Sequence, residues 1–367
     1  MNRDIKVMGS ALGPRMVVNG REVDYFCGTS YYTLHGDPRV KEAACEATRR
    51  YGMGPATLMA SPPLLEVVRR AVEFFGVESV QYIVSGYLGN MLLAQALSDE
   101  YDIVFVDAAS HYSVFDGLHS TGKRVVPFQH LDVDSFSQQL RSNIQPSQAP
   151  LVMTDGVFPV TGAIAPLKDY VNVLARYEHW LLCVDDSHAV GVIGEKGQGS
   201  LEHWGIQGDN CYLAGTLSKA FGGLGGIIPG SQQLMCKISR NVKIPDGASP
   251  PSTAAAAASA MGLKILSEHP EMRSLLWKNV AYMRAGLRQL GIKVEESPIP
   301  IISLSSLPKV DLKWVQKRLE EEGLLVAYVP PLGYSDAPNK ESLRIAIFST
   351  HSQHQLDLLL DTLGRLL

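Results

Sequence analysis

The sequence lacks several features that mark specialised classes of protein. Its five cysteines form no C-x-x-C pair, and no apolar run approaches the roughly 20 residues of a membrane-spanning helix. The spread and odd number of the cysteines disfavour a disulfide framework and a zinc site, so we expect no bound metal. A formal net charge of only −4 over 367 residues gives no basis for binding nucleic acid or a membrane surface.

The N-terminal stretch also lacks a secretion signal, because in MNRDIKVMGSALGPRMVVNG no apolar core precedes a small-residue cleavage site. The hydrophobic share of 46% and the charged share of 19% are typical of a globular protein. The length suffices for one large domain plus a smaller one. We therefore expect a cytoplasmic protein without a nucleic-acid or membrane partner.

Apolar segments alternate with amphipathic ones through most of the chain. Short apolar runs, each ending in a polar loop, lie at residues 101–111, 150–158, 180–191 and 211–219. Near-continuous apolar runs are typical of strands covered on both faces, as in a parallel sheet with crossover helices. The intervening segments 132–144 and 167–180 carry apolar residues at helical spacing. The pattern predicts an α/β fold with a large, mostly parallel sheet.

The composition changes after about residue 245. The stretch PDGASPPSTAAAAASAMGLKIL indicates a loop that leads into a small-residue helix, with prolines at the break. Beyond it we predict a long helix over about 269–290, short strands and a final amphipathic helix, as in a smaller α+β domain. The chain is thus divided into an N-terminal segment, a large domain and a small C-terminal domain, at 1–40, 41–245 and 246–367.

Polar residues stand where the predicted strands end. In parallel α/β sheets, ligands bind beyond the carboxyl ends of the strands. The residues at these ends are His111, Asp155, Asp185, His188, Thr216 and Lys219. Lys219 lies in GTLSKAFGGLGG, between small hydroxyl residues and glycines, which allow a ligand to approach the backbone closely.

This set meets the needs of pyridoxal phosphate, which requires a lysine amine and a carboxylate for its ring nitrogen. Lys219 supplies the amine, and the charge of Asp185 would keep the ring nitrogen protonated. His111 is predicted to stack on the ring and His188 to meet its phenolic oxygen. Taken singly, each of these residues is more typical of a surface, a cap or a loop, so the hypothesis depends on their joint arrangement.

A phosphate cradle is predicted at Ser85, Gly86 and Tyr87, which precede an apolar helix in VSGYLGNMLLAQAL. Backbone N–H groups at such a turn, together with the positive end of the helix dipole, favour an anion. The hydroxyl of Thr216 would complete the cradle. A lone Ser-Gly turn occurs in many loops and is weak evidence by itself.

Longer motifs resemble a known family. They are VDDSHAVGVIGEKGQGS (184–200), TDGVFPVTGAIAPL (154–167), GTLSKAFGGLGG (215–226) and SLRIAIFSTHSQHQLD (342–357). Over nearly the whole chain the sequence is similar to the α-oxoamine synthase family of fold-type I pyridoxal-phosphate enzymes. The resemblance implies an aspartate aminotransferase-like fold and a Schiff-base role for Lys219. It also implies that Arg344 binds the carboxylate of an amino acid, for which its planar fork is suited.

The resemblance further implies a reaction. An α-amino acid is condensed with an acyl thioester, carried on CoA or on an acyl carrier protein, and loss of carbon dioxide leaves an α-aminoketone. Lys219 would be both the covalent anchor and the general acid/base, and His111 would also contact the substrate. Relatives work as homodimers with active sites at the subunit interface, so we expect a homodimer here. The amino acid stays open between glycine, alanine and serine.

Several positions depart from the family pattern. Thr29 replaces a substrate-contacting asparagine, and Asp155 replaces a glutamate. The segment 52–68 lacks the family's glycine cluster and histidine. The segment 246–251 lacks its cross-subunit threonine. These changes affect the wall for the acyl donor rather than the cofactor residues.

Three interpretations follow from the departures. The first is an α-oxoamine synthase with an unusual acyl donor. The second is another pyridoxal-phosphate reaction on the same scaffold, such as transamination, decarboxylation or an aldol-type cleavage. The third, a non-catalytic subunit, is disfavoured because Lys219, Asp185, His188 and Arg344 are all kept.

Overall fold

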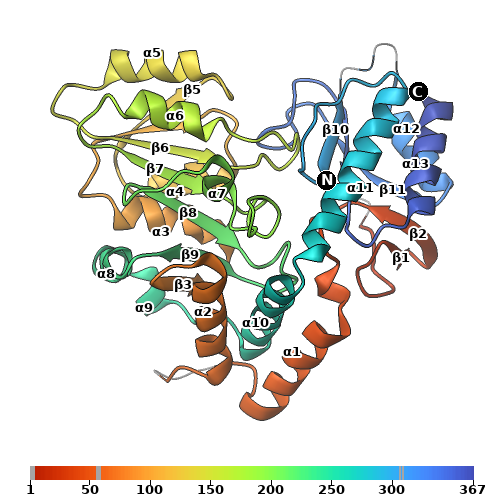
Figure 1. The fold of residues 1–367 in the computed structure, drawn as a ribbon, viewed down its shortest axis with the longest axis horizontal. Coiled ribbons are helices and arrows are strands. Elements are labelled where there is room, and N and C mark those ends of the chain that lie inside the picture. The colour runs from red at the N-terminus through yellow and green to blue at the C-terminus, as the bar shows by residue number, and fades with distance from the viewer. Residues whose placement is uncertain (1–4, 55–58, 306, 308–309) are drawn as a thin grey trace.

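Two β-sheets organise the computed structural model, which describes residues 5–54, 59–305, 307 and 310–367 (Figure 1). The larger sheet has seven strands in the order β3 (Ser79–Ile83), β9 (Gly226–Gly230), β8 (Cys211–Thr216), β7 (Leu181–Asp185), β6 (Pro150–Asp155), β4 (Ile103–Asp107) and β5 (Arg124–Phe128). Strand β9 runs antiparallel to its neighbours β3 and β8, whereas β8, β7, β6, β4 and β5 are parallel. The predicted α/β fold with a large, mostly parallel sheet is confirmed.

Helices cover both faces of this sheet. Successive side chains of a strand point to opposite faces, so one strand can contribute to an apolar cluster on each side. In β4, Val104 and Val106 pack into one apolar cluster, and Ile103 and Phe105 pack into another. The first cluster includes side chains of α3 (Gly89–Ala96), α4 (Tyr112–His119) and α8 (Gln232–Asn241). The second includes side chains of α5 (Val133–Asn143), α6 (Leu167–Leu174) and α7 (Ser200–Trp204).

The smaller sheet joins the two ends of the chain. Its order is β1 (Arg15–Val18), β2 (Arg21–Phe26), β11 (Leu324–Val329), β12 (Ser342–Ala346) and β10 (Ile301–Ser305). Strands β2 and β11 are parallel, and β12 is antiparallel to β11 and β10. The helices beside it are α11 (Glu271–Gln289), α12 (Leu312–Glu321) and α13 (Gln353–Leu366) (Figure 1). The division at residues 40 and 245 stays a prediction, and the small sheet draws strands from both sides of it.

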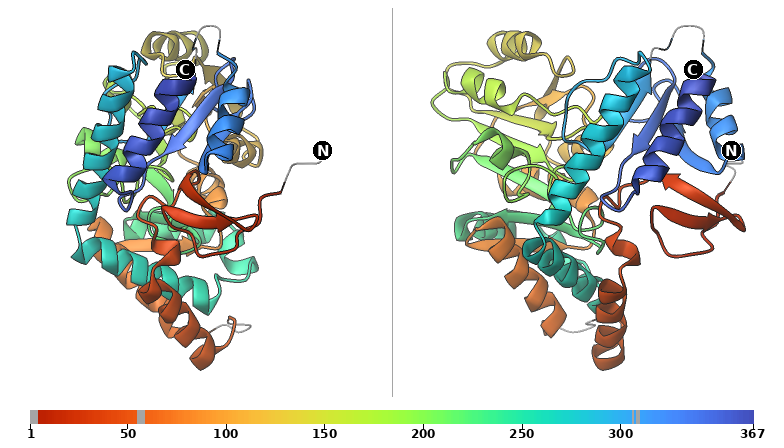
Figure 2. Two further views of the ribbon diagram at one scale, coloured as in Figure 1. Left: turned by 90° about the vertical axis from the view of Figure 1, so that its right-hand side faces the viewer. Right: turned by 45° about the vertical axis from the view of Figure 1, so that its right-hand side comes forward.

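The remaining elements are η1 (Leu34–Gly36), α1 (Pro38–Tyr51), α2 (Pro62–Phe75), η2 (Gly86–Leu88), α9 (Ile244–Gly247) and α10 (Thr253–Glu268). Of these remaining elements, α1, α2 and α10 lie in the lower part of Figure 1. Figure 2 shows α1 projecting below the body of the protein, where it packs on α10. Of the altered segment 52–68, residues 55–58 lie outside the described part. None of the described helices is long and apolar enough to cross a membrane.

Most predicted helices are present with shifted ends. The helix predicted over 132–144 is α5, and the one over about 269–290 is α11. The helix predicted over 167–180 is shorter, because α6 ends at Leu174. There the chain turns, and the Tyr177 N–H bonds to the Leu174 carbonyl at 2.9 Å. Apolar spacing beyond that point therefore belongs to a turn rather than to the helix.

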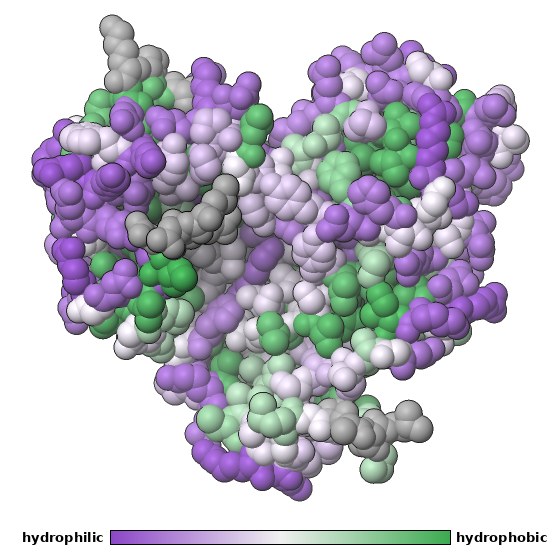
Figure 3. Space-filling model, turned by 180° about the vertical axis from the view of Figure 1, so that it is seen from behind, coloured by the Kyte–Doolittle hydropathy of each residue, from purple (hydrophilic) through white to green (hydrophobic). Residues whose placement is uncertain are grey.

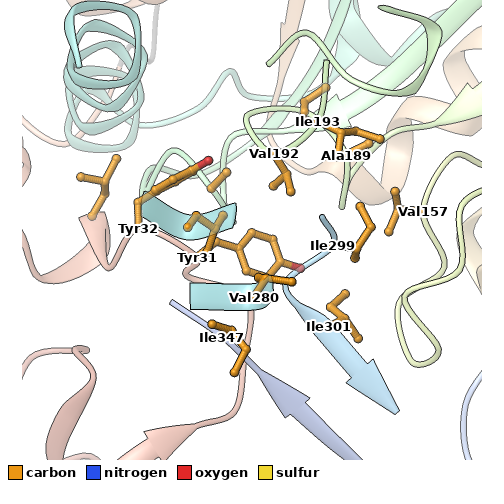
Figure 4. Close-up of a cluster of buried hydrophobic side chains, with 14 of the residues drawn as sticks. Tyr31, Tyr32, Val157, Ala189, Val192, Ile193, Val280, Ile299, Ile301 and Ile347 are labelled. Atoms are coloured by element: carbon orange, nitrogen blue, oxygen red, sulfur yellow. The ribbon is translucent and has the colours of Figure 1, made fainter. Parts of the chain in front are cut away.

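One apolar cluster ties the two halves together. Figure 4 shows Tyr31 and Tyr32 among side chains from the loop that follows β7 and from the small sheet. Leu217 and Phe221, on the loop that follows β8, belong to the same cluster and are fully buried. The loop that carries Lys219 is therefore anchored in a core shared by both halves.

Helix α10 fixes this loop by close approach, which leads to a first prediction. A Cβ on Gly262 would overlap the carbonyl oxygen of Phe221, whereas a Cβ on Gly247 would meet nothing within 4 Å. Alanine is the better helix former by roughly 0.5–1 kcal/mol, but overpacking costs about 1–3 kcal/mol. Gly262→Ala should therefore lower the free energy of unfolding measured in urea, and the control Gly247→Ala should not. Equal stability of the two variants would contradict the close approach.

Candidate active site

Lys219 follows β8 in a loop whose glycines serve packing. Gly222 has φ +66°, and a Cβ there would lie 2.5 Å from Leu34. A Cβ on Gly223 would overlap Ser259 of α10. We expected these glycines to let a ligand approach, but their bare Cα atoms face the protein instead. They let the loop lie against its neighbours and so hold Lys219 in place.

The carboxyl ends of the strands surround a cavity of ≈ 120 Å³. Parallel strands end at the same edge of a sheet, which is why residues far apart in sequence meet there. The predicted cofactor residues all line it: Ser85, Gly86, Tyr87, His111, Asp155, Asp185, His188, Thr216 and Lys219. Three residues that the sequence analysis did not single out also line it: Ser113, Ser187 and Ser218.

Asp185 is held by hydrogen bonds on both carboxylate oxygens. The Asn90 side-chain amide donates to Oδ2 at 2.6 Å, and the Ser187 backbone N–H donates to Oδ1 at 3.0 Å. Ser113 Oγ lies 3.4 Å from Oδ2. Asp185 is 5% exposed, and a buried carboxylate needs such donors to stay charged. These donors orient the carboxylate within the cavity.

Burial and neighbouring charges both shift the pKa values of the residues that line this cavity. Removal from water lowers the pKa of Lys219 to about 8, although the nearby charges of Asp185 and Asp155 act to raise it. Burial, followed by the charge of Asp185, holds the pKa of Asp155 well above its usual range. The His111 backbone N–H donates to Asp155 Oδ2 at 2.7 Å. Asp185, with a donor on each of its two oxygens, is the carboxylate placed to meet a cation in the cavity.

Both histidines are held in the neutral form. Burial, with the charge of Lys219 as a smaller cause, holds the pKa of His188 well below its usual range. The Tyr31 hydroxyl lies 2.7 Å from His188 Nδ1 and fixes the ring. Burial also lowers the pKa of His111, which caps helix α4. Its Nδ1 accepts from the Ser113 backbone N–H at 3.2 Å.

The predicted phosphate cradle is a tight turn between β3 and α3. A Cβ on Gly86 would lie 2.8 Å from the Thr216 side chain, so only glycine lets the turn approach β8 here. The Thr216 hydroxyl already donates to the Gly225 carbonyl at 2.9 Å and lies 2.7 Å from Ser218 Oγ. Ser218 therefore joins Thr216 as a hydroxyl of this cradle.

The donor set fits pyridoxal phosphate. One amine, one fixed carboxylate and a glycine turn flanked by hydroxyls line a single cavity, as this cofactor requires. Lys219 would hold its aldehyde carbon, Asp185 its ring nitrogen, and the turn at Gly86 its phosphate. The described residues contain no group of His, Cys, Asp and Glu side chains that could hold a metal ion.

A second cavity of ≈ 330 Å³ adjoins the first, and both are lined by Lys219 and His188. Arg344 and Thr29, the predicted substrate residues, line only the second one. Arg344 is 8% exposed, donating from Nε to the Pro159 carbonyl at 2.7 Å and from a terminal nitrogen to the Gly28 carbonyl at 3.1 Å. No acidic side chain of the described residues forms a salt bridge with it. A buried guanidinium with unused donors suits an incoming carboxylate.

Three contributors could not be found from the sequence. Asn90 lies within helix α3, Tyr31 lies between β2 and η1, and Tyr334 lies on the loop that follows β11. Tyr334 contacts His111 across 223 positions of the chain. Ser218 is different, since its place beside Lys219 in T-L-S-K was a usable signal.

The sequence pattern of the family described as "Aminotransferase class I and II" matches residues 27–363. The 8-amino-7-oxononanoate synthase of Thermosipho melanesiensis is 31% identical over 97% of this chain and 91% of that protein. The enzyme of the same name from Thermoanaerobacter pseudethanolicus is 32% identical over 97% of this chain and 90% of that protein.

Solved structures agree on the fold. Serine palmitoyltransferase from Sphingomonas wittichii matches with a TM-score of 0.89 at 26% identity, covering 100% of this chain and 92% of that chain. A structure of SPT with PLP matches with a TM-score of 0.90 at 24% identity, covering 99% of this chain and 92% of that chain. The predicted fold-type I architecture is confirmed.

The lowered pKa of Lys219 gives a second prediction. Only the uncharged amine can attack an aldehyde, so the cofactor-free protein should capture pyridoxal phosphate with a rate constant that rises with pH around a midpoint of about 8. Asp185→Asn removes a charge that raises this pKa, so the midpoint should move to lower pH. Absorbance changes of the added cofactor measure the rate, and Lys219→Ala, which has no amine there, is the control. A midpoint near the ordinary lysine value of 10.5 would contradict the burial of the amine.

Proposed function

The chain belongs to the aminotransferase class I and II family and, within it, to the α-oxoamine synthases, and from that premise we propose that it condenses an α-amino acid with an acyl thioester. Carbon dioxide is lost and an α-aminoketone is released. The observation that carries the proposal is the meeting of two cavities at Lys219, with Arg344 in the second. One cavity suits the cofactor, and the other is lined by a cation for a carboxylate.

Pyridoxal phosphate, when bound, supplies an electron sink for negative charge at the α-carbon of the amino acid. Asp185 keeps that sink effective through its fixed carboxylate, whose orientation depends on Asn90 and Ser187. Buried Asp155 accepts from the His111 backbone N–H and so fixes the chain that carries the His111 ring. Neutral His188, fixed by Tyr31, presents its ring to both cavities.

Lys219 moves the proton of the α-carbon. Its pKa of about 8 lies close to neutral pH, where a general base both accepts and returns a proton readily. The residue lines both cavities, so its Nζ can reach an amino acid held on the substrate side. A surface lysine, with its usual pKa, would remain protonated and could not act as a base at neutral pH.

Within the second cavity, Arg344 suits the amino acid and the apolar walls suit the acyl group. The guanidinium binds the carboxylate of the amino acid through donors that Pro159 and Gly28 leave unused. Thr29 is the nearby hydroxyl on the substrate side. Apolar side chains such as Val160 and Val329 also line this cavity and suit the hydrocarbon part of an acyl group.

We also propose that the enzyme works as a homodimer in the cytoplasm. Large apolar side chains are exposed at Met53, Leu65 and Leu224, and apolar patches gather on the lower half of the face in Figure 3. Exposed apolar surface of this kind supports burial against a second copy. The five cysteines are all free thiols, which supports a reducing compartment.

The test of the reaction uses the holoenzyme with glycine, L-alanine or L-serine and a panel of acyl-CoA and acyl-carrier-protein thioesters. We expect release of free thiol that requires both substrates, together with carbon dioxide and an aminoketone identified by mass spectrometry. Formation of a keto acid from the amino acid with no thioester present would instead favour an aminotransferase. The panel also identifies the two substrates.

A third prediction concerns Arg344. Arg344→Lys keeps the charge but removes the planar fork, so the KM for the amino acid should rise by about 10- to 100-fold, the range expected for lost hydrogen bonds to a charged group. The KM for the thioester should change much less. Steady-state kinetics with each substrate varied in turn measure the split. An equal rise in both values would mean that Arg344 supports the cavity as a whole rather than the carboxylate.

A further inference from the structure

An aromatic cluster covers the point where the two cavities meet. Tyr334 lies on the loop between β11 and β12, with its ring centroid 5.6 Å from that of His111 and 5.4 Å from that of Tyr112. It lines the second cavity together with Lys219 and Arg344 and is 39% exposed. Its hydroxyl lies 2.8 Å from His111 Nε2, and His111 lines the first cavity. The Tyr334 hydroxyl therefore stands at the junction.

The hydrogen bonds of His111 decide which way the proton of this hydroxyl points. Nδ1 accepts from the Ser113 backbone N–H at 3.2 Å, and Ser113 Oγ, whose hydroxyl can also donate, lies 2.8 Å from the same nitrogen, so we assign no proton to Nδ1. With this assignment, the proton of the neutral ring is on Nε2, which lies 2.8 Å from the Tyr334 oxygen and donates to it. Because His111 uses that oxygen as an acceptor, the O–H of Tyr334 is left to donate elsewhere.

A carboxylate holds the loop that carries Tyr334. Asp336 is buried and accepts from the Val160 N–H at 3.0 Å, the Thr161 N–H at 2.8 Å and the Thr161 hydroxyl at 2.9 Å. Val160 and Thr161 follow β6 in the loop that also supplies the Pro159 carbonyl to Arg344. The bonds tie the loop over the cavity to the wall that positions Arg344. Tyr334 is thus placed by fixed partners on two sides, His111 and the anchored loop.

We propose that the Tyr334 hydroxyl donates a hydrogen bond to the carbonyl oxygen of the acyl thioester during condensation. This role rests on the proposed function. Attack on the thioester carbon moves an electron pair onto that oxygen, and departure of the thiolate returns the pair, so the hydrogen bond requires no net proton transfer. A donor placed where charge develops lowers the barrier selectively. The donation from His111 Nε2 to the Tyr334 oxygen strengthens Tyr334 as a donor.

The charges of the two substrate groups indicate which of them binds Arg344 and which binds Tyr334. The carboxylate of the amino acid is an anion before and during the reaction, and the buried cation Arg344 suits it. The thioester carbonyl is neutral until it is attacked, so a neutral donor such as a phenol suits it. Desolvation raises the pKa of Tyr334, so the phenol keeps its proton. Through its contact with His111, Tyr334 extends the predicted contact of His111 with the substrate.

The test compares two reactions of the same holoenzyme. Without thioester, exchange of the α-hydrogen of the amino acid with deuterium oxide, followed by NMR, reports the steps before condensation. With thioester, thiol release reports condensation. Tyr334→Phe should lower the rate of thiol release by about 100-fold, the loss typical of removing one such donor, while exchange changes little. Tyr112→Phe is the matched control, because it removes a hydroxyl from the same aromatic cluster, and both rates should be kept.

A second variant tests whether the position of the Tyr334 hydroxyl matters when the hydroxyl itself is kept. Asp336→Ala keeps Tyr334 but releases its loop, so thiol release should again fall more than exchange, and thermal melting verifies that each variant is folded. Retained thiol release in Tyr334→Phe, or equal loss of both rates, would overturn the role of the hydroxyl. Absence of thiol release in the unsubstituted enzyme with every thioester would instead overturn the proposed function, and this role with it.

Discussion

The burial of one amine is the constraint on which the rest of this structure depends. An ammonium group removed from water loses hydration, which lowers the pKa of Lys219 to about 8. The charge of Asp185 opposes that effect and keeps the loss moderate. Asp185 can only do so because Asn90 and Ser187 satisfy its oxygens. A base poised near neutral pH is therefore a property of several elements, with β7, β8 and α3 meeting at one edge of the sheet.

Loss of water also acts on the ionisable groups around this pair, because charge is costly to bury. Loss of water raises the pKa of Asp155 and lowers the pKa values of His111 and His188. Arg344 adds a cation only on the substrate side, which separates the site for a carboxylate from the site for the cofactor.

The two halves of the protein contribute unequally to the site. The large sheet supplies the cofactor cavity, where strand ends hold side chains rigidly. The small sheet supplies Arg344 on β12, and the loop between β11 and β12 supplies Tyr334. A shared apolar core, to which Leu217 and Phe221 belong, fixes the lysine loop against both halves. Geometry at the junction thus depends on packing that lies away from the reacting groups.

The sequence by itself determined the sheet, its helices and the residues at the strand ends. Apolar periodicity reports burial directly, and parallel strands must end at one edge, so His111, Asp155, Asp185 and Lys219 could be expected to meet. Only the tertiary structure decided the partners that set their charges and directions. Asn90 is buried in a helix, and Tyr334 reaches His111 from 223 positions away, contacts that no local pattern encodes. The glycines beside Lys219 show the same limit, because their need for space comes from α10 and Leu34, which only folding brings near.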